Sequence, residues 1–471
     1  MSSATGVETR SLRTGKAGAV LAVLLVGVGV RLIGISQPFV DAWSWRQADV
    51  AMIAENFYRH GFRVLYPQIN WAGSAPGYIG TEFPLVPFLA SILYVFFGVS
   101  DWIGRALSVL FFACSVAFLY ALAARVFNPR SGVLAAAFWS VTPLSIFAGR
   151  SFMPDMASVA LSLGALYLFL EWLTRPTSLK LFLLTGITTS LAILVKLPAI
   201  IIGVPLFWMA WKVHSGRLFG RRELWALACL ALIPSLLWYL HAWSISRFYF
   251  PYHFFGEGGL GLMRAGDYLP IARNTATFAL TPVLVPAVAV AFALRQQSKF
   301  GRLFHWWLIA GVVFVVFAAH GNRHSWYRLP LVPPAAALAG MVWDRVLERF
   351  GRRFGARAAL VFGCMLFLAG MVYLSYKAIR PHYDPWAIPL WKAGQAVDRI
   401  AAPDALIIAV DKGDPTILYY SRRKGWHFSA SGLSTGNPSD SEEAITTLEN
   451  LRKAGATYLV FTSYTSWWLE Y

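Results

Sequence analysis

Acidic and basic side chains stand close together in the stretch DAWSWRQADVAMIAENFYRHG, which follows the first long apolar segment and includes Asp41, Arg46 and Asp49. A carboxylate can remove a proton from a hydroxyl group as a general base. An arginine can bind phosphate oxygens through charge-assisted hydrogen bonds. Arg46 falls in the first turn of a predicted helix, where the helix dipole disfavours a cation and a bound anion would offset that cost. The stretch therefore predicts a base beside an anion-binding group.

The segment SWRQ resembles a capping box, with Ser44 as the helix cap and Gln47 reaching back to the Ser44 amide. The helix that follows has one apolar face, and Asp49 and Asn56 lie on the other face. An acid early in a helix also suits the dipole, which gives Asp49 a purely structural alternative. Asp41 is more typical of a loop or cap, yet it remains the rival candidate for the base.

Ionisable residues also occur at the ends of other apolar segments. Glu82 in TEFPL precedes an apolar helix, and Asp155 in GRSFMPDMASVAL begins another. Either acid could simply stabilise a helix N-terminus, but ionisable groups at the boundary of a membrane span also mark functional sites. The groups on the same side that could bind a phosphate, or else lipid headgroups, are Arg46, Arg150, Lys196, His324, Tyr327 and Arg328.

The composition is that of a membrane protein. Of 471 residues, 57% are hydrophobic and only 14% are charged, so long apolar segments must dominate the chain. The net charge of +18 does not indicate nucleic-acid binding, because the basic residues separate apolar segments instead of forming one patch. About eleven spans are predicted, at residues 17–36, 102–126, 131–148, 154–173, 178–195, 198–213, 223–243, 274–294, 303–320, 329–347 and 357–378.

The basic residues predict the orientation of these spans. With the N-terminus in the cytoplasm, every predicted inner loop is basic, as the positive-inside rule requires. The first outer loop is then residues 37–100, and its apolar helix from about Leu85 to Phe97 is too short to span and should lie in the membrane interface. We expect a multi-pass protein of a bacterial inner membrane, with its C-terminus on the periplasmic side.

The chain changes character after about residue 378. Amphipathic or helical periodicity occurs in LWKAGQAVDRIA and SEEAITTLENLRKAG. Strand patterns occur in ALIIAVD, TILYYSRR and TYLVF. This alternation predicts a small α/β domain at 379–471, outside the membrane, after a transmembrane catalytic domain at 1–378.

Four motifs occur in the order shown by one family: WRQADVAMIAENF, GYIGTEFPLVPFLASILYVFFGV, GRSFMPDMASVAL and WYRLPLVPPAAALAG. Over about the first 340 residues, the chain resembles bacterial membrane glycosyltransferases related to protein O-mannosyltransferases and to the lipid A aminoarabinose transferase. The resemblance implies a GT-C fold and a polyprenyl-phosphate sugar donor used on the outer face. It also implies Asp49 as catalytic base, Asp155 as a second acid, and Tyr327 and Arg328 as donor-phosphate contacts.

The sequence departs from the family at two places. The acidic pair of the first outer loop is replaced by WRQAD, which leaves the choice between Asp41 and Asp49 open. Where the aminoarabinose transferase has a lysine followed by two prolines, this chain has TEFPL. An acid cannot bind phosphate directly, so Glu82 would bind the acceptor or a divalent cation such as Mg²⁺, Mn²⁺ or Zn²⁺.

The function expected from these patterns is inverting transfer of a sugar from a polyprenyl phosphate to a glycolipid, polysaccharide or protein acceptor. One carboxylate acts as the base and cations offset the charge of the departing phosphate. The alternative from another class is a transporter or flippase of lipid-linked sugars, which would carry ionisable residues in mid-span. A non-catalytic scaffold that presents the outer domain is a third hypothesis, although it leaves the outer cations unexplained.

Overall fold

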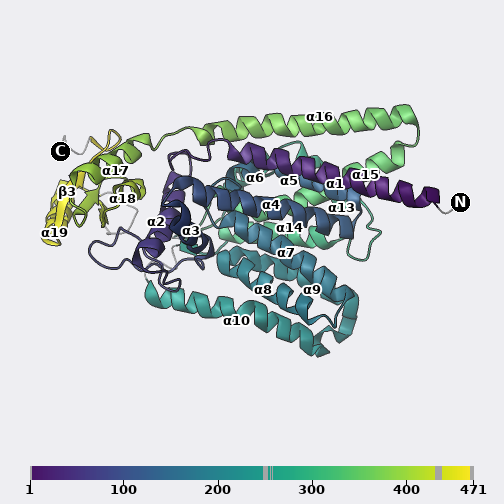
Figure 1. The fold of residues 1–471 in the computed structure, drawn as a ribbon, viewed down its shortest axis with the longest axis horizontal. Helices are drawn as coiled ribbons and strands as arrows, with labels where there is room; N and C mark the ends of the chain where they lie inside the picture. Colours follow the sequence, from purple (N-terminus) through teal and green to yellow (C-terminus); the bar gives the residue numbers. More distant parts are fainter. Residues whose placement is uncertain (1–2, 248–252, 255, 257, 430–437, 467–471) are drawn as a thin grey trace.

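The computed structural model is a long helical bundle with a small α/β unit at one end (Figure 1). It describes the whole chain except residues 1–2, 248–252, 255, 257, 430–437 and 467–471. The N-terminus lies at the far end of the bundle from the C-terminal unit. The helices of the first outer loop lie between the bundle and that unit, so three layers follow one another along the long axis.

Most of the predicted spans are helices. The bundle contains α1 (Ser3–Leu32), α4 (Asp101–Val126), α5 (Pro129–Val141), α6 (Pro143–Ala148), α7 (Asp155–Thr174), α8 (Leu179–Val195), η1 (Leu197–Ile202), α9 (Gly203–His214), η2 (Ser215–Gly220) and α10 (Arg222–Ile245). It continues with η3 (Ala265–Asp267), α12 (Tyr268–Asn274), η4 (Thr275–Leu280), α13 (Leu284–Ala293), α14 (Leu303–Ala318), η5 (Ser325–Leu331), α15 (Val332–Phe350), α16 (Phe354–Ile379) and η6 (Arg380–Tyr383).

Two predicted spans are not single helices. The segment 131–148 breaks into α5 and α6 because Pro143 cannot donate the backbone hydrogen bond that would continue the helix. The segment 274–294 bends by 99° between η4 and α13. Among the described residues, five helices are long and apolar enough to cross a membrane, or six if the bent pair forms one span. The count of eleven spans therefore stays a prediction.

Small residues let α15 pack against the centre of the bundle. Gly340 lies so close to α5 that a Cβ atom there would stand 2.8 Å from the Ser131 carbonyl oxygen. Membrane helices use small residues in this way because close backbone contact increases van der Waals attraction. Since η5 leads directly into α15, this packing also fixes the WYRLP segment that precedes the helix.

The first outer loop forms two helices, α2 (Ser44–His60) and α3 (Leu85–Phe97). The predicted apolar helix at 85–97 is confirmed, and α2 begins at Ser44, the residue that was expected to cap it. The predicted capping box is wrong, because Trp43 is the N-cap residue and makes no side-chain cap bond. Ser44 Oγ instead donates to Asp414 at 3.0 Å, and Gln47 Nε2 donates to Asp41 at 2.7 Å, so both side chains hold α2 to neighbouring segments.

The C-terminal unit consists of α17 (Ile388–Ile400), β1 (Leu406–Ala409), α18 (Thr416–Ser421), β2 (Gly425–His427), α19 (Ser441–Lys453) and β3 (Ala456–Val460). The strands form a parallel sheet in the order β2-β1-β3. The predicted helices at the positions of α17 and α19 and the strands at β1 and β3 are confirmed. The strand predicted from TILYYSRR is wrong, since this segment forms α18.

Backbone hydrogen bonds join the C-terminal unit to the first outer loop. Gly73 N donates to Gly425 O at 2.7 Å, and Gly425 N donates to Asn70 O at 2.9 Å. The hydroxyl group of Tyr420 in α18 donates to the carboxylate of Asp101, the first residue of α4, at 2.7 Å. Buried apolar residues of α2, α3, α17 and α18 complete one shared core. This packing holds the ends of the strands against α2.

Candidate active site

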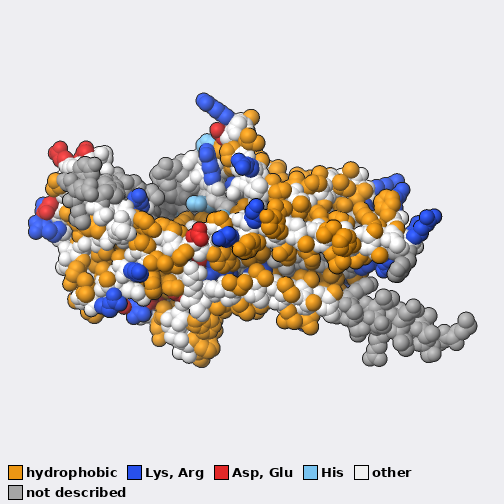
Figure 2. All heavy atoms as spheres, turned by 90° about the horizontal axis from the view of Figure 1, so that it is seen from above, with side chains coloured by type: hydrophobic (Ala, Val, Ile, Leu, Met, Phe, Trp, Pro, Cys, Tyr) orange, Lys and Arg blue, Asp and Glu red, His pale blue; other side chains and the backbone are white. Residues whose placement is uncertain are grey.

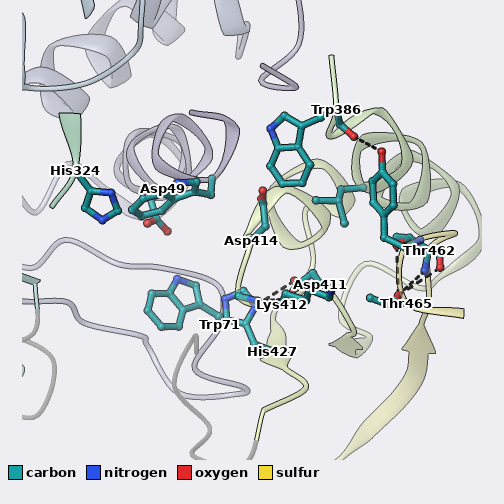
Figure 3. Close-up of a pocket in the computed structure, with 14 residues that line it drawn as sticks. Asp49, Trp71, His324, Trp386, Asp411, Lys412, Asp414, His427, Thr462 and Thr465 are labelled. Atoms are coloured by element: carbon teal, nitrogen blue, oxygen red, sulfur yellow. Dashed lines mark hydrogen bonds and ion pairs between the residues drawn. The ribbon is translucent and has the colours of Figure 1, made fainter. Parts of the chain in front are cut away.

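Asp49 lies in a cavity of about 550 Å³ between α2 and the C-terminal unit. Figure 3 shows Asp49, Trp71 and His324 on one side, and residues of the C-terminal unit on the other. The C-terminal residues that line the cavity are Trp386, Leu390, Asp411, Lys412, Gly413, Asp414, His427, Thr462, Tyr464 and Thr465. The cavity is therefore formed by segments far apart in the sequence.

The carboxyl group of Asp49 has one oxygen available for a substrate. Its Oδ2 lies 3.9 Å from Arg46 Nη1, while its buried Oδ1 has no hydrogen-bond partner among the described residues. Burial raises the pKa of Asp49 to about 7, although the charge of Arg46 counteracts part of this effect. A base with a pKa near the working pH is efficient, because it is available unprotonated and still accepts a proton readily.

The carboxylate of Asp41, the rival candidate, is occupied by hydrogen bonds. Its side chain is fully buried and accepts hydrogen bonds from Gln47 at 2.7 Å, Arg150 at 3.0 Å and Arg105 at 3.2 Å. Arg150 also donates to the Gly34 carbonyl oxygen at 3.0 Å. The structure thus places Asp41 and Arg150 in one buried ion-pair network at the start of α2, away from the cavity lining.

A second cluster of charges lies beside Arg46. Glu82 pairs with Arg46 and His253, and its Oε1 lies 3.6 Å from Lys196 Nζ. Lys196 Nζ is also 3.6 Å from Asp155 Oδ2. Burial by itself would raise the pKa of Glu82, but Lys196, Arg46 and His253 together hold it well below its usual value. Glu82 is thus an ionised acid among three basic side chains.

The WYRLP segment covers this cluster. The Tyr327 ring centroid lies 5.5 Å from Lys196 Nζ, and His324 stacks on Trp326 with ring centroids 4.3 Å apart. Burial, aided by the charges of Arg46 and Lys196, lowers the pKa of His324 to about 4, so this histidine is neutral at pH 7. Arg328 donates to Asn274 Oδ1 at 2.7 Å and to the Arg323 carbonyl oxygen at 3.3 Å, which holds it at the edge of the cluster.

The structure brings most of the sequence-predicted residues together. Glu82 and Asp155 share Lys196, Glu82 and Asp49 share Arg46, and Tyr327 and His324 lie against the same group. The sequence analysis missed His253, Asp411, Asp414 and His427. The motif VDKGDP directly after a predicted strand could have indicated Asp411 and Asp414, because ligands of α/β proteins bind at the carboxyl ends of parallel strands.

The residues around Glu82 do not fit the divalent cation considered for them. The described groups paired with Glu82 are all basic, and a divalent cation needs several oxygen ligands that are not already neutralised. Within the described ranges, no group of three or more His, Cys, Asp or Glu side chains is arranged to hold a metal ion.

The comparisons with known proteins agree with this architecture. A family model described as dolichyl-phosphate-mannose-protein mannosyltransferase matches residues 81–240. No curated protein matches the chain in sequence.

Among solved structures, ArnT from Cupriavidus metallidurans, with undecaprenyl phosphate bound, is similar with a TM-score of 0.67 and 15% identity, over 94% of this chain and 90% of that one. The Archaeoglobus fulgidus oligosaccharyltransferase, in a complex with Zn and sulfate, has a TM-score of 0.65 and 14% identity, over 94% of this chain and 67% of that one. The family-model match over residues 81–240 and the shared fold confirm the resemblance drawn from the motifs: this chain has the fold of the GT-C membrane glycosyltransferases.

Proposed function

We propose that the protein transfers a sugar from a polyprenyl phosphate to an acceptor hydroxyl group on the outer face of the membrane, with Asp49 as the general base. The observation that carries this proposal is the contrast between the two acids of the first loop. Asp49 has an oxygen in a cavity that no described residue pairs with, whereas the carboxylate of Asp41 is held by two arginines and a glutamine. A base must be able to reach the proton that it removes.

In the proposed reaction, the acceptor oxygen attacks the anomeric carbon of the donor sugar as its proton passes to Asp49. The bond between that carbon and the phosphate oxygen breaks, and the polyprenyl phosphate leaves with the bonding electrons. Arg46 and Lys196 stabilise the charge that develops on the phosphate, and Tyr327 and Arg328 flank them. The donor's anomeric configuration is inverted, because this scheme contains one displacement and no enzyme nucleophile.

Within this proposal, Glu82 positions the cations. It contacts Arg46, Lys196 and His253, and its negative charge reduces the repulsion between Arg46 and Lys196 before the donor binds. Asp155 holds Lys196 from the other side. The ArnT structure contains undecaprenyl phosphate, a lipid phosphate of the proposed donor class, which supports the choice of donor for a chain with the same fold.

The proposal is tested by incubating the purified full-length protein in detergent with radiolabelled polyprenyl-phosphate sugars and a membrane extract as the acceptor source. We expect label to leave the donor and to appear in a product whose anomeric configuration, measured by NMR, is opposite to that of the donor. A product with the donor's configuration would contradict the single displacement. Movement of intact donor across vesicles, without any transfer, would favour the transporter hypothesis.

A further inference from the structure

The outer wall of the cavity is formed by one edge of the parallel sheet. Asp411 and Asp414 follow β1, His427 ends β2, and Thr462 follows β3, and all four residues line the cavity (Figure 3). The carboxyl ends of parallel strands are the usual place where open α/β sheets bind ligands. The C-terminal unit therefore presents its expected ligand-binding edge directly to Asp49.

His427 is oriented within this edge. Its ring is buried, and Nδ1 lies 2.8 Å from Asp411 Oδ1 and 3.0 Å from Oδ2. The buried Nε2 has no hydrogen-bond partner among the described residues, although the residue lines the cavity. Buried polar atoms normally have partners, so an unpaired nitrogen and the unpaired Asp49 Oδ1 in one cavity indicate a polar ligand.

The charge state of His427 complements that of Asp49. Burial by itself would lower the pKa of His427, but Asp411, Asp49 and Asp414 together raise it. The protonated ring donates a hydrogen bond from each nitrogen, one of them to Asp411. His427 Nε2 then donates a hydrogen bond into the cavity, and Asp49 Oδ1 can accept one. A single hydroxyl group fits both, with its oxygen at His427 and its proton at Asp49.

The remaining lining distinguishes between classes of acceptor. Trp45, Trp71, Trp386 and Tyr464 contribute aromatic surface, and the negative faces of aromatic rings attract the weakly positive C–H groups of a sugar. Three aspartates line the cavity against one lysine and His427. A phosphate group on the acceptor would be repelled by these carboxylates, whereas neutral hydroxyl groups can bind to them.

We propose that this cavity is the acceptor site and that the acceptor is an uncharged carbohydrate, whose attacking hydroxyl group is held by His427 Nε2 and deprotonated by Asp49. The assignment rests on the proposed transferase function. It goes further by naming the class of acceptor and by giving the C-terminal unit a direct part in binding it. His427 is a binding residue here, and Asp411 is a positioning residue that fixes the ring.

The test measures binding and transfer separately, with the full-length protein in detergent. Saturation-transfer NMR compares neutral methyl hexosides and short oligosaccharides with their phosphorylated counterparts as ligands. The variant is His427→Gln, and the control is His60→Gln at the exposed end of α2, which does not line the cavity. Transfer from a polyprenyl-phosphate sugar to the same saccharides is then followed as kcat and KM.

We expect neutral saccharides to bind more tightly than the phosphorylated ones. His427→Gln loses one hydrogen bond from a charged group, so saccharide binding should weaken, or the KM for the acceptor should rise, by about tenfold or more. Its affinity for the polyprenyl-phosphate sugar should stay unchanged. His60→Gln should bind saccharides as the wild type does. Stronger binding of phosphorylated acceptors, or equal saccharide binding by His427→Gln, would overturn the assignment. Saccharide binding without any transfer would instead contradict the proposed function and leave the cavity's specificity supported.

Discussion

At the scale of single residues, hydrogen bonding separates the roles of Asp41 and Asp49. Both are acids of the first outer loop with little exposed surface. Asp41 is surrounded by hydrogen-bond donors, whereas Asp49 has an oxygen without a partner in the described part of the chain. A carboxylate whose lone pairs are already occupied by arginines is a poor base. The same arginines make Asp41 a strong structural element, because they would be buried without a counter-charge if it were removed.

The buried position of Asp49 predicts how activity depends on pH. The carboxyl must be ionised to accept a proton, and its pKa is raised from 3.8 to about 7. Transfer should therefore be low in acid, rise as the pH increases through about 7, and fall again at the higher pH where His427 loses the proton with which it binds the acceptor. Arg46, His427, Asp414 and Glu82 also act on this group, and the two acids help to keep its pKa high. The measurement is kcat/KM for the acceptor against pH, and a profile that is flat between pH 5 and 8 would contradict the assignment.

Replacing Asp41 should affect stability. Asp41→Asn removes the negative charge between Arg105 and Arg150, both of which are fully buried. Breaking one partner of a buried ion pair costs about 3–5 kcal/mol. We expect a clearly lower thermal midpoint in detergent, measured by intrinsic fluorescence. A variant as stable as the wild type would show that the network contributes little to folding.

At the scale of elements, the site depends on the first turn of α2 and on the loop that carries Glu82. A cation in the first turn of a helix is disfavoured by the dipole, and Glu82 supplies the compensating charge. The anion beside Arg46 was expected from the sequence to be a ligand. The structure shows that an acid of the chain itself also occupies this position.

This arrangement predicts the effect of Glu82→Gln. The variant keeps the size of the side chain but leaves Arg46, Lys196 and His253 without their shared carboxylate. If Glu82 positions the cations, kcat should fall by about tenfold or more, because their placement around the phosphate is lost. The KM for the acceptor should change little. A selective rise in that KM, with kcat unchanged, would show that Glu82 binds the acceptor instead.

The pairing of β2 with β1 gives a second prediction for an element. A Cβ atom at Gly425 would lie 1.8 Å from the Ile407 carbonyl oxygen, so Gly425→Val must separate β2 from β1. We expect faster proteolysis of the C-terminal unit and loss of acceptor binding. Gly216→Ala is the control, because no atom lies within 4 Å of the position of its added Cβ. Equal protease resistance of the two variants would contradict the structural role of Gly425.

The elements differ in how well the sequence predicts them. The helix at 85–97 was predictable because every residue between Pro84 and Gly98 except Ser91 is apolar. TILYY was misassigned because isoleucine, tyrosine and threonine favour strands, yet the segment packs as α18 against α17. Tertiary packing commonly overrides such preferences in short segments. The Asp411–His427 pair could not be predicted from spacing, since only the parallel pairing of β1 with β2 brings it together.

At the scale of the whole molecule, the site lies at one end of a long apolar body. Hydrophobic side chains cover much of the surface along the body in Figure 2, and Lys and Arg side chains lie at both of its ends. The cavity lies at the opposite end, beside the C-terminal unit (Figure 1). This position of the cavity fits the proposal that the N-terminus faces the cytoplasm and that the chemistry takes place on the outer surface.

The orientation predicts where the C-terminus lies. A phosphatase reporter that is active only outside the cytoplasm should be active when fused after Tyr471. The same reporter should be inactive when fused in the predicted inner loop near Arg217. The measurement is reporter activity in intact cells, normalised to the amount of fusion protein. The reverse pattern would place the cavity on the cytoplasmic side and would contradict the proposed outer-face reaction.

The most direct test of the central claim is a comparison of Asp49→Asn with the wild type in single-turnover transfer from a labelled polyprenyl-phosphate sugar, with donor affinity measured on the same preparations. Asparagine keeps the shape of the side chain but cannot accept a proton. We predict a loss of transfer by at least about a hundredfold, with donor affinity and thermal midpoint preserved, since general-base catalysis contributes about 10²–10⁴-fold. Transfer by Asp49→Asn at the wild-type rate would show that Asp49 is not the base.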